Sequence, residues 1–199
     1  GSINDAQVLP LDPRVEALQE AYIRKVVDTV QDLPNVLYEV ANESVGGGAI
    51  DQAFAQMLGL AEPPQWGDST SWQYWVITTL KQYEQQMGYT PHPVGMTMQY
   101  PVANQQAVNT PLFNSPADWI SPGYDDPIFT GGQHPNAPGS PPSHWYVYPP
   151  AADRRKVILT DTDHYAAGKG DALWAWKSFL RGHHPILMDF GLIEGVSLP

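Results

Sequence analysis

The chain has 199 residues, so we expect a single domain over 1–199 and no second large one. Ten Lys and Arg residues against 21 Asp and Glu residues give a formal net charge of −11, which disfavours nucleic acid or an anionic membrane as the partner. Because 42% of the residues are hydrophobic, we expect order over most of the chain. The absence of cysteine excludes a disulfide, a thiolate nucleophile and a zinc–thiolate site.

The first half of the chain alternates helix and strand patterns. A capping Asp12 precedes a stripe of apolar residues at helical spacing, which predicts a long helix that ends near Leu33. Residues 35–43 (NVLYEVANE) are typical of a short strand that is buried on both faces. A second amphipathic helix is predicted over 71–87, and a second buried strand over 92–98.

The second half of the chain is less regular. Residues 102–150 are rich in Pro, Gly and Asn, which predicts a long loop with a brief strand at 118–121. A strand is predicted over 156–163, then a helix over 171–181 and a last strand over 185–189. This alternation predicts an α/β fold with a parallel sheet and right-handed crossovers. Enzymes of that architecture carry their chemistry at the carboxyl ends of the strands.

Polar residues follow three of the predicted strands: Asn42 and Glu43, then Gln99 and Tyr100, then residues 161–164 (DTDH). Cleavage of a glycosidic bond requires at least two carboxylates, which two different strand ends can supply. One protonates the leaving oxygen, and the other attacks the anomeric carbon or activates water. Glu43 and Asp161 are the best such pair, with Asn42 beside them to hydrogen-bond a sugar hydroxyl.

Two sequence segments resemble a known group of enzymes. VLYEVANES resembles the fourth strand of the clan A glycoside hydrolases, whose (β/α)8 barrels end that strand in Asn-Glu. The resemblance implies that Glu43 is the acid/base of a retaining mechanism. In that clan the nucleophile ends the seventh strand, and VILTDTDH places Asp161 at the matching position, where the clan uses Glu. Residues 161–189 further resemble cellulase-like or apiosidase-like barrel proteins of bacterial genomes.

This alignment implies that the chain corresponds to about strands four to eight of a TIM (β/α)8 barrel, a fold that usually takes about 250 residues. Five strands would leave an open edge on each side, with unpaired backbone groups. We therefore expect the partial barrel either to rearrange or to associate with another chain, as in a homo-oligomer such as a dimer, which would cover the open edge.

Other side chains are candidates for contact with a carbohydrate. Tyrosine and amide groups at strand ends suit hydroxyl recognition, and indole faces near loops or strand ends can stack on sugar rings, although burial in the core is the alternative for any Trp. The candidates besides the catalytic pair are Asn42, Trp66, Gln99, Tyr100, Trp119, Tyr124, Trp145, Asp163 and His164.

Other aromatic and histidine residues are interpreted as structural. Trp72 and Trp176 fall at helical spacing and are predicted to pack in the core. His183 and His184 follow Gly182 after a helix and are predicted to lie in a solvated turn.

Two further functions stay open from the sequence. Asp161, Asp163 and His164 are spaced to form an oxygen-rich cation site, which would make the protein a metal-dependent hydrolase. Alternatively, the chain is an inactive barrel fragment that serves as an assembly or carbohydrate-binding module, because groups from the missing strands would not position a substrate. The glycosidase mechanism itself needs a carbohydrate substrate and no cofactor. No phosphate-binding loop and no Gly-x-Ser-x-Gly motif is present.

Overall fold

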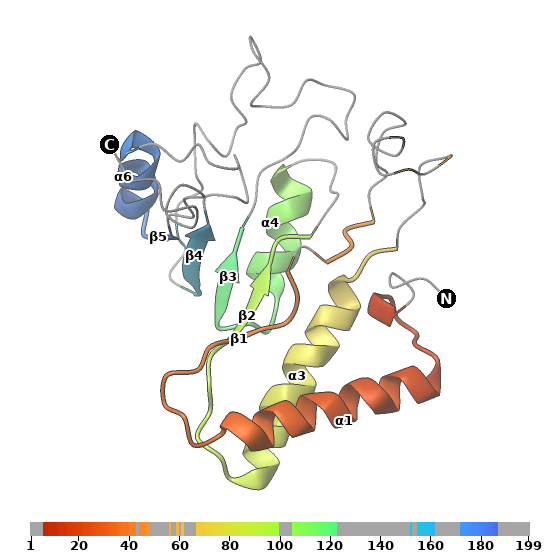
Figure 1. Cartoon of the computed structure of the whole chain (residues 1–199). Coiled ribbons are helices and arrows are strands. Elements are labelled where there is room, and N and C mark those ends of the chain that lie inside the picture. Colours follow the sequence, from red (N-terminus) through yellow and green to blue (C-terminus); the bar gives the residue numbers. More distant parts are fainter. Residues whose placement is uncertain are drawn as a thin grey trace.

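The computed structural model describes residues 6–42, 44–47, 56, 59, 61, 67–99, 105–122, 152, 155–161 and 172–186, with the backbone alone for 105–108, 161 and 172–174. Helices and strands alternate along most of this part of the chain (Figure 1). The elements are α1 (Pro13–Val30), β1 (Tyr38–Glu39), α3 (Thr70–Met87), β2 (Val94–Thr97), α4 (Gln105–Asn114), β3 (Trp119–Ser121), β4 (Val157–Asp161), α6 (Ala172–Leu180) and β5 (His184–Ile186).

The strands form a five-stranded sheet in the order β1-β2-β3-β4-β5. Each strand lies beside the strand that follows it in the chain. Every neighbouring pair is parallel. A doubly wound sheet reverses this order at a switch point, whereas a (β/α) barrel keeps it. The predicted α/β fold with an open parallel sheet is therefore confirmed, and the order is compatible with part of a barrel.

The two long helices begin and end near the predicted residues for local reasons. The Asp12 carboxylate accepts a hydrogen bond of 2.9 Å from the Arg14 backbone N–H and so caps α1. Helix α3 ends at Gly88, whose φ of 70° is a left-handed conformation that glycine adopts without strain. None of the described helices combines the length and the apolar content that a membrane crossing needs.

One face of the sheet is covered by helices. Alternate strand residues on this face are buried in one core with side chains from α1, α3 and α4. The strand residues of the core are Tyr38, Val94, Met96, Ile120 and Ile158, and the helix residues include Ile23, Val27, Ile77, Leu80 and Leu112. The strand residues that alternate with these core residues lie on the second face of the sheet. In a closed barrel that second face would be the interior.

On the second face, the Trp119 indole lies across strand β2. Trp119 is the register partner of Gly95, and a Cβ atom built on Gly95 would come within 1.9 Å of the Trp119 Cε2 atom. The position therefore accepts only glycine while the indole stays in place. Trp119 is 7% exposed, and its Nε1 group has no hydrogen-bond partner in the part of the chain that the structure describes.

Helix α4 differs from the sequence prediction. It lies in the stretch predicted as a loop and contains Pro111, a residue that normally argues against a helix interior. Leu112 of this helix is fully buried in the core, and the Tyr74 hydroxyl donates a hydrogen bond to the Pro111 carbonyl. Tertiary contacts with α3 and the sheet thus stabilise a segment whose own pattern is weak.

Two structural predictions for aromatic and histidine residues were wrong. Trp176 is 63% exposed on α6 and does not pack in the core. His183 is buried, because the backbone turns at Gly182, with a φ of 87°, and the ring meets strand β4. Its Nδ1 atom lies 2.8 Å from the Thr160 hydroxyl. Trp72 is buried as predicted, and its indole N–H donates to the Gln19 side chain.

Candidate functional site

Three of the predicted site residues lie at one edge of the sheet. Parallel strands place their carboxyl ends together, and Asn42, Gln99 and Asp161 follow or end β1, β2 and β4. The backbone of Asp161 is fixed as the last residue of β4, with Ile186 as its register partner. Asn42 is exposed, whereas Gln99 is buried. The carboxyl edge is therefore the candidate site, as in other parallel α/β proteins.

One further candidate among the described residues, Trp119, lies apart from this group. Trp119 begins β3 and so lies on the second face at the amino end of that strand. The predicted site residues that lie outside the described residues are Glu43, Trp66, Tyr100, Tyr124, Trp145, Asp163 and His164.

The Gln99 side chain connects the end of β2 to the start of α3. Its amide nitrogen donates to the hydroxyls of Ser69 and Thr70, each at 3.0 Å, and lies 3.1 Å from an oxygen of the Asp68 carboxylate. The Val45 carbonyl is a further acceptor at 3.4 Å. We call these side chains the Gln99 network. A buried amide with several acceptors around it is held in place and cannot turn toward a ligand without losing these bonds.

The same network fastens the segment that follows β1. The Ser69 hydroxyl donates to the Ser44 hydroxyl at 2.9 Å, and both side chains are buried. The Ser69 backbone N–H donates to the Val45 carbonyl at 2.9 Å, and the Gly47 N–H donates to the Gly67 carbonyl at 3.0 Å. Ser44 directly follows Glu43 in the sequence. The backbone immediately after the predicted acid/base is thus anchored to the start of α3.

Asp68 is the charged side chain of the Gln99 network. Its carboxylate accepts hydrogen bonds from the Thr70 backbone N–H at 2.8 Å and from the Thr70 hydroxyl at 2.6 Å. Burial raises the pKa of the nearby Tyr74 phenol, and the negative charge of Asp68 raises it further. Among the described residues, no group of three or more His, Asp or Glu side chains is placed to hold a metal ion.

Sequence reasoning missed Ser44, Ser69 and Thr97 as parts of this edge. The Thr97 hydroxyl donates to the Ala41 carbonyl at 2.6 Å and so ties the ends of β1 and β2 together. The run Asp68-Ser69-Thr70 before a helical pattern is a capping signal that was available in the sequence. The hydrogen bonds of these residues to Gln99 join positions about thirty residues apart, and a local sequence pattern cannot predict such a contact.

Comparison of the chain with protein-family models, with curated proteins and with solved structures gives no match.

Proposed function

We propose that the protein is a retaining glycoside hydrolase, with Glu43 as the acid/base and Asp161 as the nucleophile. The observation that supports the proposal is the order and direction of the strands. Strands β1 and β4 run parallel in a chain-ordered sheet, so the residues that follow β1 and those that end β4 belong to the same edge. Its substrate is a carbohydrate, and the reaction needs no metal or organic cofactor.

The proposal requires the two carboxyl groups to approach each other across the distance between β1 and β4. Three interstrand distances of about 4.8 Å separate β1 from β4, or roughly 14 Å along the sheet. Side chains that extend toward each other from these strand ends, and any curvature of the sheet, shorten the gap between the carboxyl groups. A retaining mechanism requires that gap to be about 5 to 5.5 Å, and an inverting one about 6.5 to 9.5 Å.

In the proposed reaction, the protonated Glu43 carboxyl gives its proton to the glycosidic oxygen while an Asp161 oxygen attacks the anomeric carbon. The carbon–oxygen bond to the leaving group breaks, and a glycosyl ester on Asp161 forms. The Glu43 carboxylate then takes a proton from water, whose oxygen attacks the anomeric carbon and releases Asp161. Asn42 hydrogen-bonds the hydroxyl beside the reacting carbon.

The test of Glu43 uses two leaving groups on the same sugar. In a panel of aryl glycosides, we expect Glu43→Gln to slow a phenyl glycoside by about 10² to 10⁴-fold, because phenol must be protonated as it leaves. A dinitrophenyl glycoside needs no proton, so the glycosylation step for that substrate should change little. Glu39→Gln is the matched control, because Glu39 is an exposed carboxylate on β1, four residues before Glu43 in the sequence.

The test of Asp161 is Asp161→Asn, which should abolish turnover of both glycosides because the covalent step is lost. The exposed Asp32 provides a control, Asp32→Asn. Folded wild-type protein without turnover across the panel would refute the proposal. Equal rates for wild type and Glu43→Gln on the phenyl glycoside would refute the role of Glu43.

A second candidate function is that of a non-catalytic assembly or carbohydrate-binding module. The exposed apolar side chains on α1 and α6 favour it, since such surfaces usually mark contacts with another protein. Absence of turnover together with specific retention on a polysaccharide, or with stable association, is the result expected of this module.

A further inference from the structure

Helix α6 carries an exposed apolar ridge beside the edge strand β5. Trp176, Phe179 and Leu180 are 63%, 58% and 79% exposed and lie on one face of the helix. The rings of Trp176 and Phe179 meet edge to face, with centroids 6.0 Å apart. With Ala175 and Pro185, Trp176 and Phe179 also line an apolar hollow of about 280 Å³. We call Trp176, Phe179 and Leu180 the α6 ridge.

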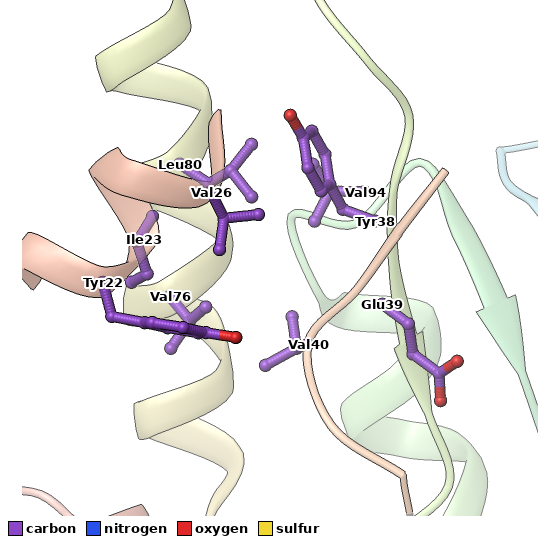
Figure 2. Close-up of a pocket in the computed structure, with 9 residues that line it drawn as sticks. All are labelled: Tyr22, Ile23, Val26, Tyr38, Glu39, Val40, Val76, Leu80 and Val94. Atoms are coloured by element: carbon purple, nitrogen blue, oxygen red, sulfur yellow. The ribbon is translucent and has the colours of Figure 1, made fainter. Parts of the chain in front are cut away.

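The opposite end of the sheet carries an apolar hollow of about 230 Å³. Figure 2 shows Tyr22, Ile23 and Val26 of α1 on one side of it, facing Tyr38 and Val40 across the gap. Tyr22 is 71% exposed although it lines this space. Leu18, one turn earlier on α1, is 72% exposed. We call this space the β1 hollow.

We propose that the α6 ridge of one copy of the chain packs into the β1 hollow of a second copy, and that the contact is reciprocal in a head-to-tail pair. In the chain-ordered sheet each helix–strand unit packs against the next one. Within the described residues, no strand pairs with the outer side of β5 or of β1. A second copy supplies at each end the apolar surface that a neighbouring unit would provide.

Side chains make this contact, and backbone pairing contributes little. Pro185 in the middle of β5 has no N–H group, so that edge offers few donors to an added strand. Two side chains of opposite charge favour the ridge-to-hollow arrangement. Lys177 follows Trp176 in the sequence of α6, and the exposed Glu39 lines the β1 hollow.

The exposed area is enough for a stable pair. From the exposed fractions, the α6 ridge and the surface around Tyr22 and Leu18 each present roughly 300 to 400 Å² of apolar side chain. Two reciprocal contacts would therefore bury about 1,200 to 1,600 Å², which is within the range of specific protein–protein interfaces.

The experiment measures molar mass by sedimentation equilibrium across the micromolar range for wild type, a ridge variant and a hollow variant. The variants are Phe179→Asp and Tyr22→Asp, and the control is Met87→Asp, which alters an exposed apolar residue at the end of α3. We expect a dimer for wild type and the control, and a dissociation constant at least about 30-fold higher for each variant.

Mixing the two variants distinguishes the proposed arrangement from other dimers. The Tyr22→Asp copy keeps an intact ridge and the Phe179→Asp copy keeps an intact hollow, so the mixture should form a heterodimer through one contact. A ridge-to-ridge dimer would be insensitive to Tyr22→Asp, and that result would overturn the proposal. So would a monomeric wild type or a series of larger polymers. Far-UV circular dichroism checks folding, and Phe179→Ser and Tyr22→Ser replace any variant that unfolds.

Discussion

The buried pair of His92 and Glu84 makes the stability of the protein depend on pH. The His92 Nδ1 atom lies 2.8 Å from a Glu84 carboxylate oxygen, and the Nε2 atom lies 3.0 Å from the Leu33 carbonyl oxygen. Neither oxygen has a proton to donate, so both bonds form only when the imidazole is protonated. The hydrogen bond to Glu84 is the main cause that raises the pKa of His92, burial opposes it, and the Leu33 carbonyl and the Glu84 charge add to the increase.

The sign of the effect follows from this raised pKa. The folded state holds the proton more tightly than the unfolded state, in which histidine has a pKa of about 6.5. The stabilisation is therefore complete below about pH 6.5 and is lost as the pH rises through the pKa of the folded state. A neutral ring can donate to only one of the two oxygens. One buried acceptor then loses its partner, which costs about 1 to 3 kcal/mol of the free energy of unfolding.

The assay is urea unfolding of wild type and Glu84→Gln, followed by circular dichroism from pH 6 to pH 9. The glutamine side chain has nearly the same shape as that of Glu84 and can donate to a neutral His92, so the variant should lack the fall in stability that wild type shows. The exposed His184 gives a control, His184→Gln, which should keep the wild-type profile. A constant difference between wild type and Glu84→Gln over this pH range would refute the reasoning, as would wild-type stability that rises with pH.

Three further predictions concern the sheet, its carboxyl edge and the proposed pair. Gly95→Ala should lower the free energy of unfolding by about 1 to 3 kcal/mol, because the added Cβ would overlap the Trp119 indole. In urea titrations, Trp119→Ala should lower the free energy of unfolding less in the Gly95→Ala protein than in wild type, because the overlap is then removed. Gln99→Leu should destabilise the protein by about 1 to 3 kcal/mol and increase hydrogen exchange at the Gly47 amide, whereas unchanged exchange there would contradict the anchoring role of the Gln99 network. Because each copy carries a net charge of −11, added salt should strengthen the pair in sedimentation equilibrium, and weakening by salt would argue against an apolar contact.

The positions of helices α1 and α3 could be predicted because their signals are local. The cap at Asp12 and the glycine at position 88 mark the ends of α1 and α3 directly in the sequence. Helix α4 could not be predicted, because Pro111 hides it and its stability comes from the burial of Leu112. Strand β1 was predicted over nine residues and as buried on both faces, but it is two residues long and buried only at Tyr38, because it lies at the edge of the sheet and pairs with one neighbour.

The candidate site could be predicted in outline only. Asn42, Gln99 and Asp161 reach one edge because parallel strands align their carboxyl ends, which a sequence pattern can anticipate. What Gln99 does there depends on Ser69 and Thr70, which approach it through the packing of α3 on the sheet. The same limit explains His183, whose burial against Thr160 depends on the turn at the end of α6.

The agreement between strand order and chain order has a consequence for how the protein is made. During synthesis, each strand emerges from the ribosome after the strand that will be its neighbour, so pairing need not wait for a distant part of the chain. Contacts that close short loops cost less entropy and form faster than contacts between remote segments. The sheet can therefore grow strand by strand in the order of translation.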